Sequence, residues 1–242
     1  MDRQQGGIIT DSKAAAKGED TYGSVGYQSI WTYDTTWKRR MILTKEGILV
    51  VRDELTPGTS ADGMVAGPVW HLLNAPNQGV LYANRREDGS LWFDANKYGT
   101  TAEWFDAPSV HMPDALQKRR PGVTLPGENA MNLMIAFGPA PGRINGTQFQ
   151  PKDGFYANDY AVYNRATLRA GRNEIFVSVL IPHVPELLPE TIAESGRSGG
   201  LQINTFKDGR SVVTIEVNDK IWERPPITVE MKPGDEWSVV RK

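Results

Sequence analysis

The sequence has no cysteine and only three histidines among its 242 residues. The missing cysteines exclude disulfide bonds, thiol nucleophiles and cysteine-ligated zinc, although they do not assign a cellular compartment. The histidines, His71, His111 and His183, lie far apart and form neither an HxH nor an HExxH motif. The candidates for acid-base or metal chemistry are therefore few.

Long apolar runs and long basic runs are also missing. No apolar run approaches the roughly 20 residues that span a bilayer, and the N-terminus lacks the charged, apolar and small-residue order of an export signal. The net charge is -2, and the densest basic run is Lys118-Arg119-Arg120. Nucleic-acid binding draws much of its affinity from neutralising phosphates, so nucleic acid is not an expected partner. A membrane is not an expected partner either, because no apolar run is long enough to span it.

Two common enzyme signatures are absent as well. The sequence has no GxxxxGK[ST] phosphate loop and no dinucleotide-binding fingerprint on a strand-helix unit. Nucleotide-dependent and Rossmann-type functions therefore have no support in the sequence. Helical periodicity is almost absent too, and the helix-favouring segments are short. They cover residues 12–17, 113–120 and 185–195.

The chain is rich in strand patterns, and the clearest is a hairpin. Two apolar runs, residues 41–43 and 48–51, flank the short polar turn Thr44-Lys45-Glu46-Gly47. Pro57-Gly58 is expected to end the pairing. The charged residues around the hairpin are expected at the rim of a sheet rather than in a core. They are Arg39, Arg40, Arg52, Asp53 and Glu54.

Further strands follow at short spacing. A second hairpin joins residues 81–85 to 91–93, and residues 174–181 are apolar enough for the centre of a sheet. Gly- and Pro-rich passages at 121–127 and 138–146 are expected to be long loops. The remaining strands are expected at residues 131–137, 161–169, 201–206, 211–217, 227–231 and 237–240. This pattern predicts an all-β protein, a large antiparallel β-sandwich with few short helices, as a single domain over residues 1–242.

His71 is the best chemical candidate. It follows Trp70 on an expected strand, and Asn74 and Asn77 come close behind, so a polar cluster is expected around one loop region. The alternative is a core histidine whose hydrogen bond is satisfied. His183, which follows the apolar strand at 174–181, is interpreted as structural.

The aromatic residues and one carboxylate offer further candidates. Trp92 and Tyr98 have flat faces that could stack on sugar rings, and Tyr98 lies beside Lys97, which can lower the pKa of a phenol toward use as a base. The alternative is that these aromatics are ordinary core or loop residues. Asp94 lies between His71 and His111 in the sequence, but this spacing does not establish a metal site.

Three segments together resemble a known family. WKRRMILTKEGILVVRDEL, then GPVWHLLN, then YNRATLRAGRNEIFVSVLIPH is similar to the C-terminal β-domain of the heparinase II/III-like polysaccharide lyases. In that family an Arg-led strand, an acidic-ended apolar strand and a Trp/His-bearing strand follow in this order. The resemblance covers roughly residues 27–183 and implies a supersandwich-like β-domain of a larger enzyme.

The resemblance implies a β-elimination that cleaves a uronate-containing polysaccharide, with a helical toroid, as a domain or subunit, supplying most of the active site. The β-domain would form one wall of the saccharide cleft. His71 matches its histidine position, and Tyr98 is a second catalytic candidate. The predicted substrate contacts are Trp70, Asn74, Asn77 and Trp92.

The resemblance also implies a periplasmic or secreted location and a divalent metal such as zinc. The candidate ligands of that metal are His71, Asp94 and His111, although zinc-binding members often have His-x-His where this chain has His71-Leu72-Leu73. The competing hypothesis is a non-catalytic carbohydrate-binding or interaction module.

Overall fold

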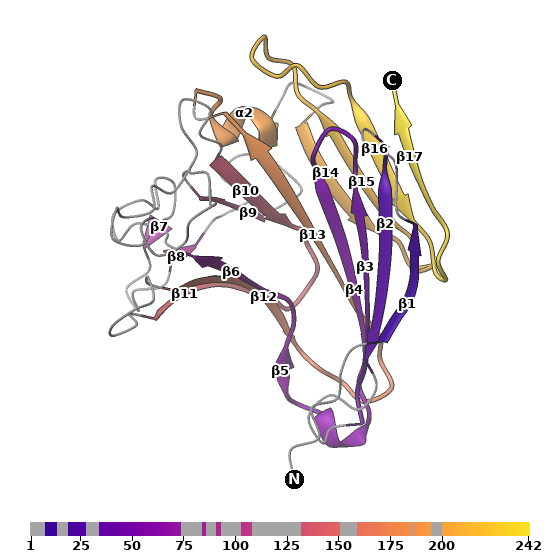
Figure 1. Cartoon of the computed structure of the whole chain (residues 1–242). Helices are drawn as coiled ribbons and strands as arrows, with labels where there is room; N and C mark the ends of the chain where they lie inside the picture. Colours follow the sequence, from indigo (N-terminus) through magenta and orange to yellow (C-terminus); the bar gives the residue numbers. More distant parts are fainter. Residues whose placement is uncertain are drawn as a thin grey trace, which may run out of the picture.

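The structure is a computed structural model (Figure 1). It describes residues 8–13, 19–27, 34–73, 84–85, 91–92, 103–107, 132–150, 159–184, 186–194 and 200–242. In these ranges the chain forms three antiparallel sheets of four or more strands, a two-stranded ribbon and one short α-helix. The prediction of an all-β antiparallel sandwich is confirmed.

The largest sheet, the central sheet, has seven strands in the order β1-β2-β3-β4-β13-β10-β9. All its neighbours are antiparallel. Its strands are β1 Ile8–Lys13, β2 Thr21–Tyr27, β3 Thr36–Leu43, β4 Leu49–Thr56, β13 Glu174–His183, β10 Asn132–Phe137 and β9 Glu103–Ala107.

Two four-stranded sheets accompany it. The C-terminal sheet contains β14 Gly200–Thr205, β15 Ser211–Glu216, β16 Ile227–Met231 and β17 Trp237–Arg241. The lateral sheet contains β11 Arg143–Gln150, β12 Asp159–Thr167, β5 Val65–Ala66 and β6 Val69–Leu73. The remaining elements are the ribbon β7 Asn84–Arg85 and β8 Leu91–Trp92, the 3-10 helix η2 Thr59–Ala61, and α2 Pro189–Glu194.

The predicted first hairpin is confirmed as β3 and β4. Leu43 pairs with Leu49 next to the turn, and the pairing ends at Thr36 and Thr56, just before Pro57. The turn uses Gly47 with φ of 80°, a conformation that favours glycine. The hairpin is therefore fixed in register by its turn and stopped where the sequence predicts.

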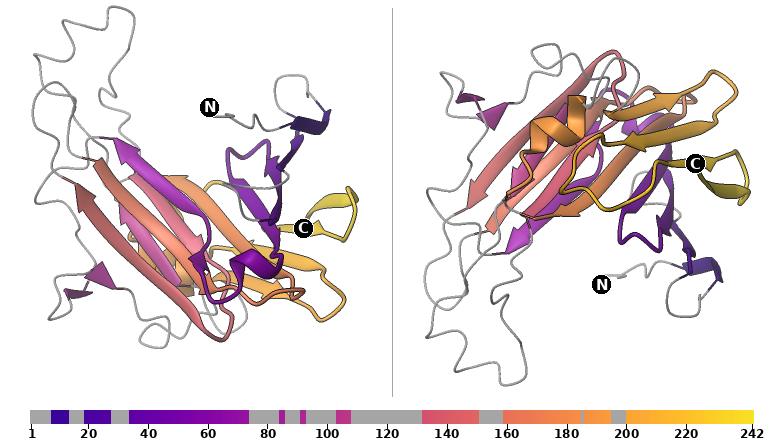
Figure 2. Two further views of the ribbon diagram at one scale, coloured as in Figure 1. Left: turned by 90° about the horizontal axis from the view of Figure 1, so that it is seen from below. Right: turned by 90° about the horizontal axis from the view of Figure 1, so that it is seen from above.

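The apolar strand β13 lies between β4 and β10, as its composition predicts. Its residues Val177 and Val179 belong to the main hydrophobic core together with Ile203 of the C-terminal sheet. Phe176, which alternates with them, packs in a second cluster with Ala166 of the lateral sheet. Because successive residues of a strand face opposite sides, the central sheet is covered on both faces. Figure 1 shows the C-terminal strands β16 and β17 and the lateral strands β6, β11 and β12 on opposite sides of β13, and Figure 2 gives two further views of the same arrangement.

The expectation that the hairpin charges lie at the rim of a sheet is wrong. Arg40, Arg52 and Asp53 lie within β3 and β4 and are 4%, 1% and 0% exposed. They are tolerated there because they meet opposite charges or polar atoms: Asp53 pairs with Arg39, and Glu54 pairs with both Arg40 and Arg52. Charge pairing therefore extends the two strands well beyond their apolar runs.

Two shorter predictions also need correction. The helix-favouring segment 12–17 is described only at Ser12 and Lys13, which are strand residues of β1 paired with β2; there strand pairing overrides local propensity. Residues 138–146 were expected to be a loop, yet β11 begins at Arg143, which pairs with Ala166. In the helix-favouring segment 185–195, Pro189–Glu194 form the short helix α2, and residues 113–120 lie outside the described ranges.

The last strand is tied to the start of the central sheet by Arg241. Its guanidinium donates to Glu46 Oε1 at 2.7 Å and to Asp20 Oδ2 at 3.1 Å. Burial alone would raise the pKa of Asp20 and of Glu46, but hydrogen bonds, chiefly from Arg241, outweigh it and hold both pKa values below their ordinary values. We call these three residues the Arg241 staple.

The Arg241 staple predicts an acid-sensitive stability. Carboxylates with a lowered folded-state pKa contribute stability that is present above their unfolded pKa, roughly 4, and lost as the pH falls through the folded value. Urea unfolding measured from pH 7 to pH 3 should show Arg241→Gln less stable at neutral pH and less sensitive to acid. The control Arg169→Gln removes an exposed arginine and should keep the wild-type profile. An unchanged acid dependence in Arg241→Gln would contradict the role of the staple.

Candidate functional site

The candidate site begins at β6, which carries Trp70 and His71. This strand pairs with β12, where Trp70 is opposite Val162 and His71 is opposite Ala161. The Trp70 side chain is half-buried against the main core. For His71 the structure gives the position of the backbone, and its imidazole lies outside what is described.

Asp53 on β4 anchors the side chains that approach this strand from the central sheet. Its carboxylate is fully buried and accepts from Arg39 Nε at 2.7 Å and from Arg39 Nη2 at 3.0 Å, a bidentate ion pair. The indole Nε1 of Trp37 donates to the same carboxylate at 2.7 Å. Three charge-assisted hydrogen bonds therefore hold Arg39 and Trp37 in place.

Arg39 in turn reaches the predicted site. Its guanidinium carbon lies 5.1 Å from the ring centre of Trp37 and 5.2 Å from that of Trp70, within cation–π range. The hairpin and the Trp-His strand, which are neighbours in the sequence, thus contact each other across two sheets. We call Trp37, Arg39, Asp53 and Trp70 the Arg39 clamp.

The clamp was missed in the sequence because its charges were interpreted as rim residues. The β3–β4 register, which follows from the position of the Thr44–Gly47 turn, pairs Arg39 with Asp53 and Trp37 with Leu55. This register is the feature of the sequence from which the Arg39–Asp53 ion pair could be predicted. Since Asp53 already neutralises Arg39, this arginine is not a free cation for a substrate carboxylate. Arg39 can instead hold the side chain of Trp70, the residue before His71, in place.

A second charged network lies on the opposite face of the same hairpin, against the C-terminal sheet. Arg52 donates to Glu54 Oε2 at 2.7 Å, to the Gly209 carbonyl at 2.9 Å and to Ser211 Oγ at 3.3 Å. Arg40 donates to the Lys232 carbonyl at 3.3 Å. Both arginines are therefore used to join two sheets.

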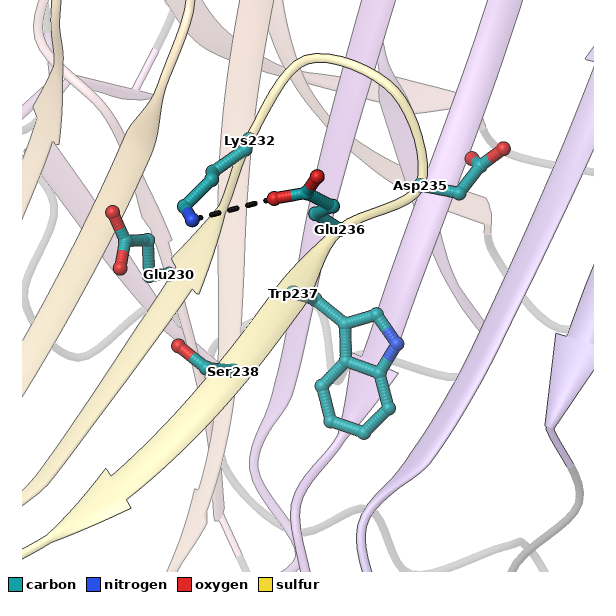
Figure 3. Close-up of a pocket in the computed structure, with 6 residues that line it drawn as sticks. All are labelled: Glu230, Lys232, Asp235, Glu236, Trp237 and Ser238. Atoms are coloured by element: carbon teal, nitrogen blue, oxygen red, sulfur yellow. Dashed lines mark hydrogen bonds and ion pairs between the residues drawn. The ribbon is translucent and has the colours of Figure 1, made fainter.

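A polar pocket of about 310 Å³ lies at the β16–β17 turn (Figure 3). It is lined by Glu230, Lys232, Asp235, Glu236, Trp237 and Ser238. Its carboxylates are engaged: Glu236 pairs with Lys232, Glu230 with Arg210, and Asp235 with Lys38. An anionic polymer would meet three carboxylates here, so this pocket is a poor site for a uronate.

Tyr22 of the central sheet contacts two residues that line this pocket. Its ring stacks on Trp237 with centroids 5.7 Å apart, and its hydroxyl donates to Asp235 at 2.8 Å. Burial, followed by the hydrogen bond to Asp235, raises the pKa of Tyr22 to about 12. The phenol is therefore held in its protonated form at neutral pH and serves as a structural donor.

The other predicted site residues are not brought together by the described structure. Trp92 lies on β8 opposite Asn84, with its side chain outside what is described. Among the described residues, no three His, Cys, Asp or Glu side chains form a group that could hold a metal ion. The remaining candidates, Asn74, Asn77, Asp94, Tyr98 and His111, lie outside the described ranges.

His183 is buried at the end of β13, with 2% of its surface exposed. Its Nδ1 lies 2.9 Å from the carbonyl oxygen of Val184. This placement agrees with the structural interpretation of His183.

Comparison with known proteins gives matches at the level of structure. No family model matches the sequence, and no curated protein matches it. The structure is similar to heparan sulfate lyase HepC from Pedobacter heparinus, with TM-score 0.49 and 11% identity over 98% of this chain and 28% of that chain. It is similar to a heparinase III structure, with TM-score 0.48 and 10% identity over 93% of this chain and 27% of that one.

This chain spans about 28% of the length of HepC. Within the described ranges, no helix has the length and apolar character needed to cross a membrane.

Replacing Asp53 tests the Arg39 clamp. Asp53→Asn keeps the shape of the side chain but leaves Arg39, whose side chain is 23% exposed, without its counter-charge. Removing one partner of a buried ion pair typically costs 3–5 kcal/mol, and we expect a loss on the order of 3 kcal/mol in the free energy of unfolding, measured with urea. The control Lys232→Ala breaks an exposed pair and should change it by less than about 1 kcal/mol. Equal small losses in both variants would contradict the clamp.

Proposed function

We propose that the chain, residues 1–242, is a single β-sandwich domain of a polysaccharide lyase and forms one wall of a saccharide cleft. One observation carries this proposal: the segments that resemble the lyase family occupy adjacent elements. β4 pairs with β13, β12 pairs with β6, and the Arg39 clamp joins the hairpin to Trp70. The three motifs thus meet around the strand that carries His71.

The reaction proposed for the complete enzyme is β-elimination on a uronate-containing polysaccharide. A base removes the proton beside the uronate carboxylate, a neighbouring group neutralises that carboxylate, and an acid protonates the leaving oxygen. His71 is assigned to neutralising the carboxylate or to transferring a proton, and Tyr98 is a second candidate. A helical toroid, as a domain or subunit, would supply the remaining groups.

The other proposed roles follow from this arrangement. Trp70, Trp92, Asn74 and Asn77 are the proposed substrate contacts. Arg39 is a positioning residue, because its charge is committed to Asp53. A divalent metal such as zinc would take His71, Asp94 and His111 as ligands, and no step of the mechanism is assigned to it. A periplasmic or secreted location belongs to the same proposal.

A lyase assay tests the proposal. The full chain, alone and together with a helical toroid domain, is incubated with alginate, heparin, chondroitin and ulvan, and the absorbance of the unsaturated uronate is followed. We expect cleavage with the toroid present, and a loss of at least 100-fold in kcat/KM in His71→Ala, within the range of general acid–base contributions. The control Asn204→Ala changes an exposed residue of β14 and should keep full activity.

The outcomes separate the two function hypotheses. Saccharide binding without cleavage in any combination would contradict the lyase and favour the non-catalytic binding module. Cleavage that survives His71→Ala would contradict the role of His71 while leaving the lyase assignment in place.

A further inference from the structure

A belt of polar side chains crosses the layer between the central sheet and the lateral sheet. On β12, Asn164 lies between Ala166, which belongs to the second hydrophobic cluster, and Val162, which belongs to the main core. On β13, Ser178 lies between Phe176 of the second cluster and Leu180, which packs on the main core. Asn164 and Ser178 are therefore the polar residues at which each strand passes from one hydrophobic cluster to the other.

Trp70 is a third polar group near Asn164. It is paired directly with Val162 across β6 and β12, and Asn164 is two residues further along β12. Residues two apart on a strand face the same side, so Trp70 and Asn164 are diagonal neighbours on one face of the lateral sheet. We call Trp70, Asn164 and Ser178 the polar belt.

Two side chains of the polar belt are fully buried, and in the described structure the polar atoms of all three lack a hydrogen-bond partner. Asn164 is 0% exposed and Ser178 is 1% exposed. In the described part of the chain, no protein atom forms a hydrogen bond with Asn164 Oδ1, Asn164 Nδ2, Ser178 Oγ or Trp70 Nε1. Buried polar groups are nearly always satisfied in folded proteins, and leaving them unsatisfied carries the full desolvation penalty. These buried atoms therefore require hydrogen-bond partners other than the described protein groups.

The chemistry of the belt selects the kind of group. The Trp70 indole can only donate, whereas the Asn164 amide and the Ser178 hydroxyl both donate and accept. A cation would satisfy the acceptors alone, and an anion the donors alone. The adjacent Asp53 is neutralised by its bidentate pair with Arg39, so the surroundings favour neither sign. Water, which donates and accepts, fits this set.

We propose that the polar belt is an internal hydration site, in which one or more water molecules bridge β6 and β12 of the lateral sheet to β13 of the central sheet. Buried waters typically make about three hydrogen bonds to protein groups, which is the number of side chains that the belt provides. The bridge shares Trp70 with the Arg39 clamp. The inference does not depend on the proposed lyase function.

Water–protein NMR on the full chain tests the site directly. We expect cross-relaxation between long-lived water and the side-chain N–H groups of Trp70 and Asn164. Asn164→Leu, which has nearly the same volume and no polar atoms, should abolish the Trp70 signal and lower the urea midpoint. The control Asn204→Leu makes the same change at an exposed position on β14 and should retain both signals.

Ser178→Ala provides a second variant should Asn164→Leu fail to fold. It should weaken the water signals at Trp70 and Asn164 while keeping the fold, because the proposed water loses one of its three protein partners. The proposal is overturned if the wild type shows no long-lived water at Trp70 or Asn164, or if Asn164→Leu raises the urea midpoint, as the removal of a truly unsatisfied amide would.

Discussion

The register of the β3–β4 hairpin is the constraint on which the rest of the structure depends. The turn ending at Gly47 sets which residues of β3 and β4 lie opposite each other, and successive residues of each strand face opposite sides. As a result, Arg39 and Asp53 face the lateral sheet, while Arg40 and Arg52 face the C-terminal sheet. A slip of one residue would exchange the two sets and bring each charge to a surface without its partner. Both outer sheets are therefore placed by one short turn.

Buried charge is used differently on the two faces of this hairpin. Toward the lateral sheet, Asp53 fixes aromatic side chains through Arg39. Toward the C-terminal sheet, Arg52 satisfies carbonyl and hydroxyl groups of the opposing strands, including Ser211. A buried ion pair adds little net stability compared with apolar packing. Its contribution here is better described as specificity, since each pair is satisfied in one arrangement of the sheets.

Much of the fold could be predicted from the sequence, because it depends on local patterns. The hairpin around Gly47, the central strand β13 and the C-terminal strands all follow from apolar runs and turn residues. The buried positions of Arg40 and Arg52 could not be predicted in this way, because their burial depends on partners more than a hundred residues away, Lys232 and Gly209. For the candidate site, Trp70 and the β6 strand were identified, whereas the contribution of Arg39 required the three-dimensional contact.

The order in which the sheet is assembled has a consequence for synthesis of the chain. β4 lies beside β13, and the Arg241 staple joins residues 221 positions apart. As the chain emerges from the ribosome, β1–β4 can form as a meander but must wait for β13 and the C-terminal strands before either face is covered. Non-local pairing of this kind folds slowly and leaves strand edges exposed. Strands β1–β4 are thus expected to need protection from aggregation until β13 and the C-terminal strands have been made.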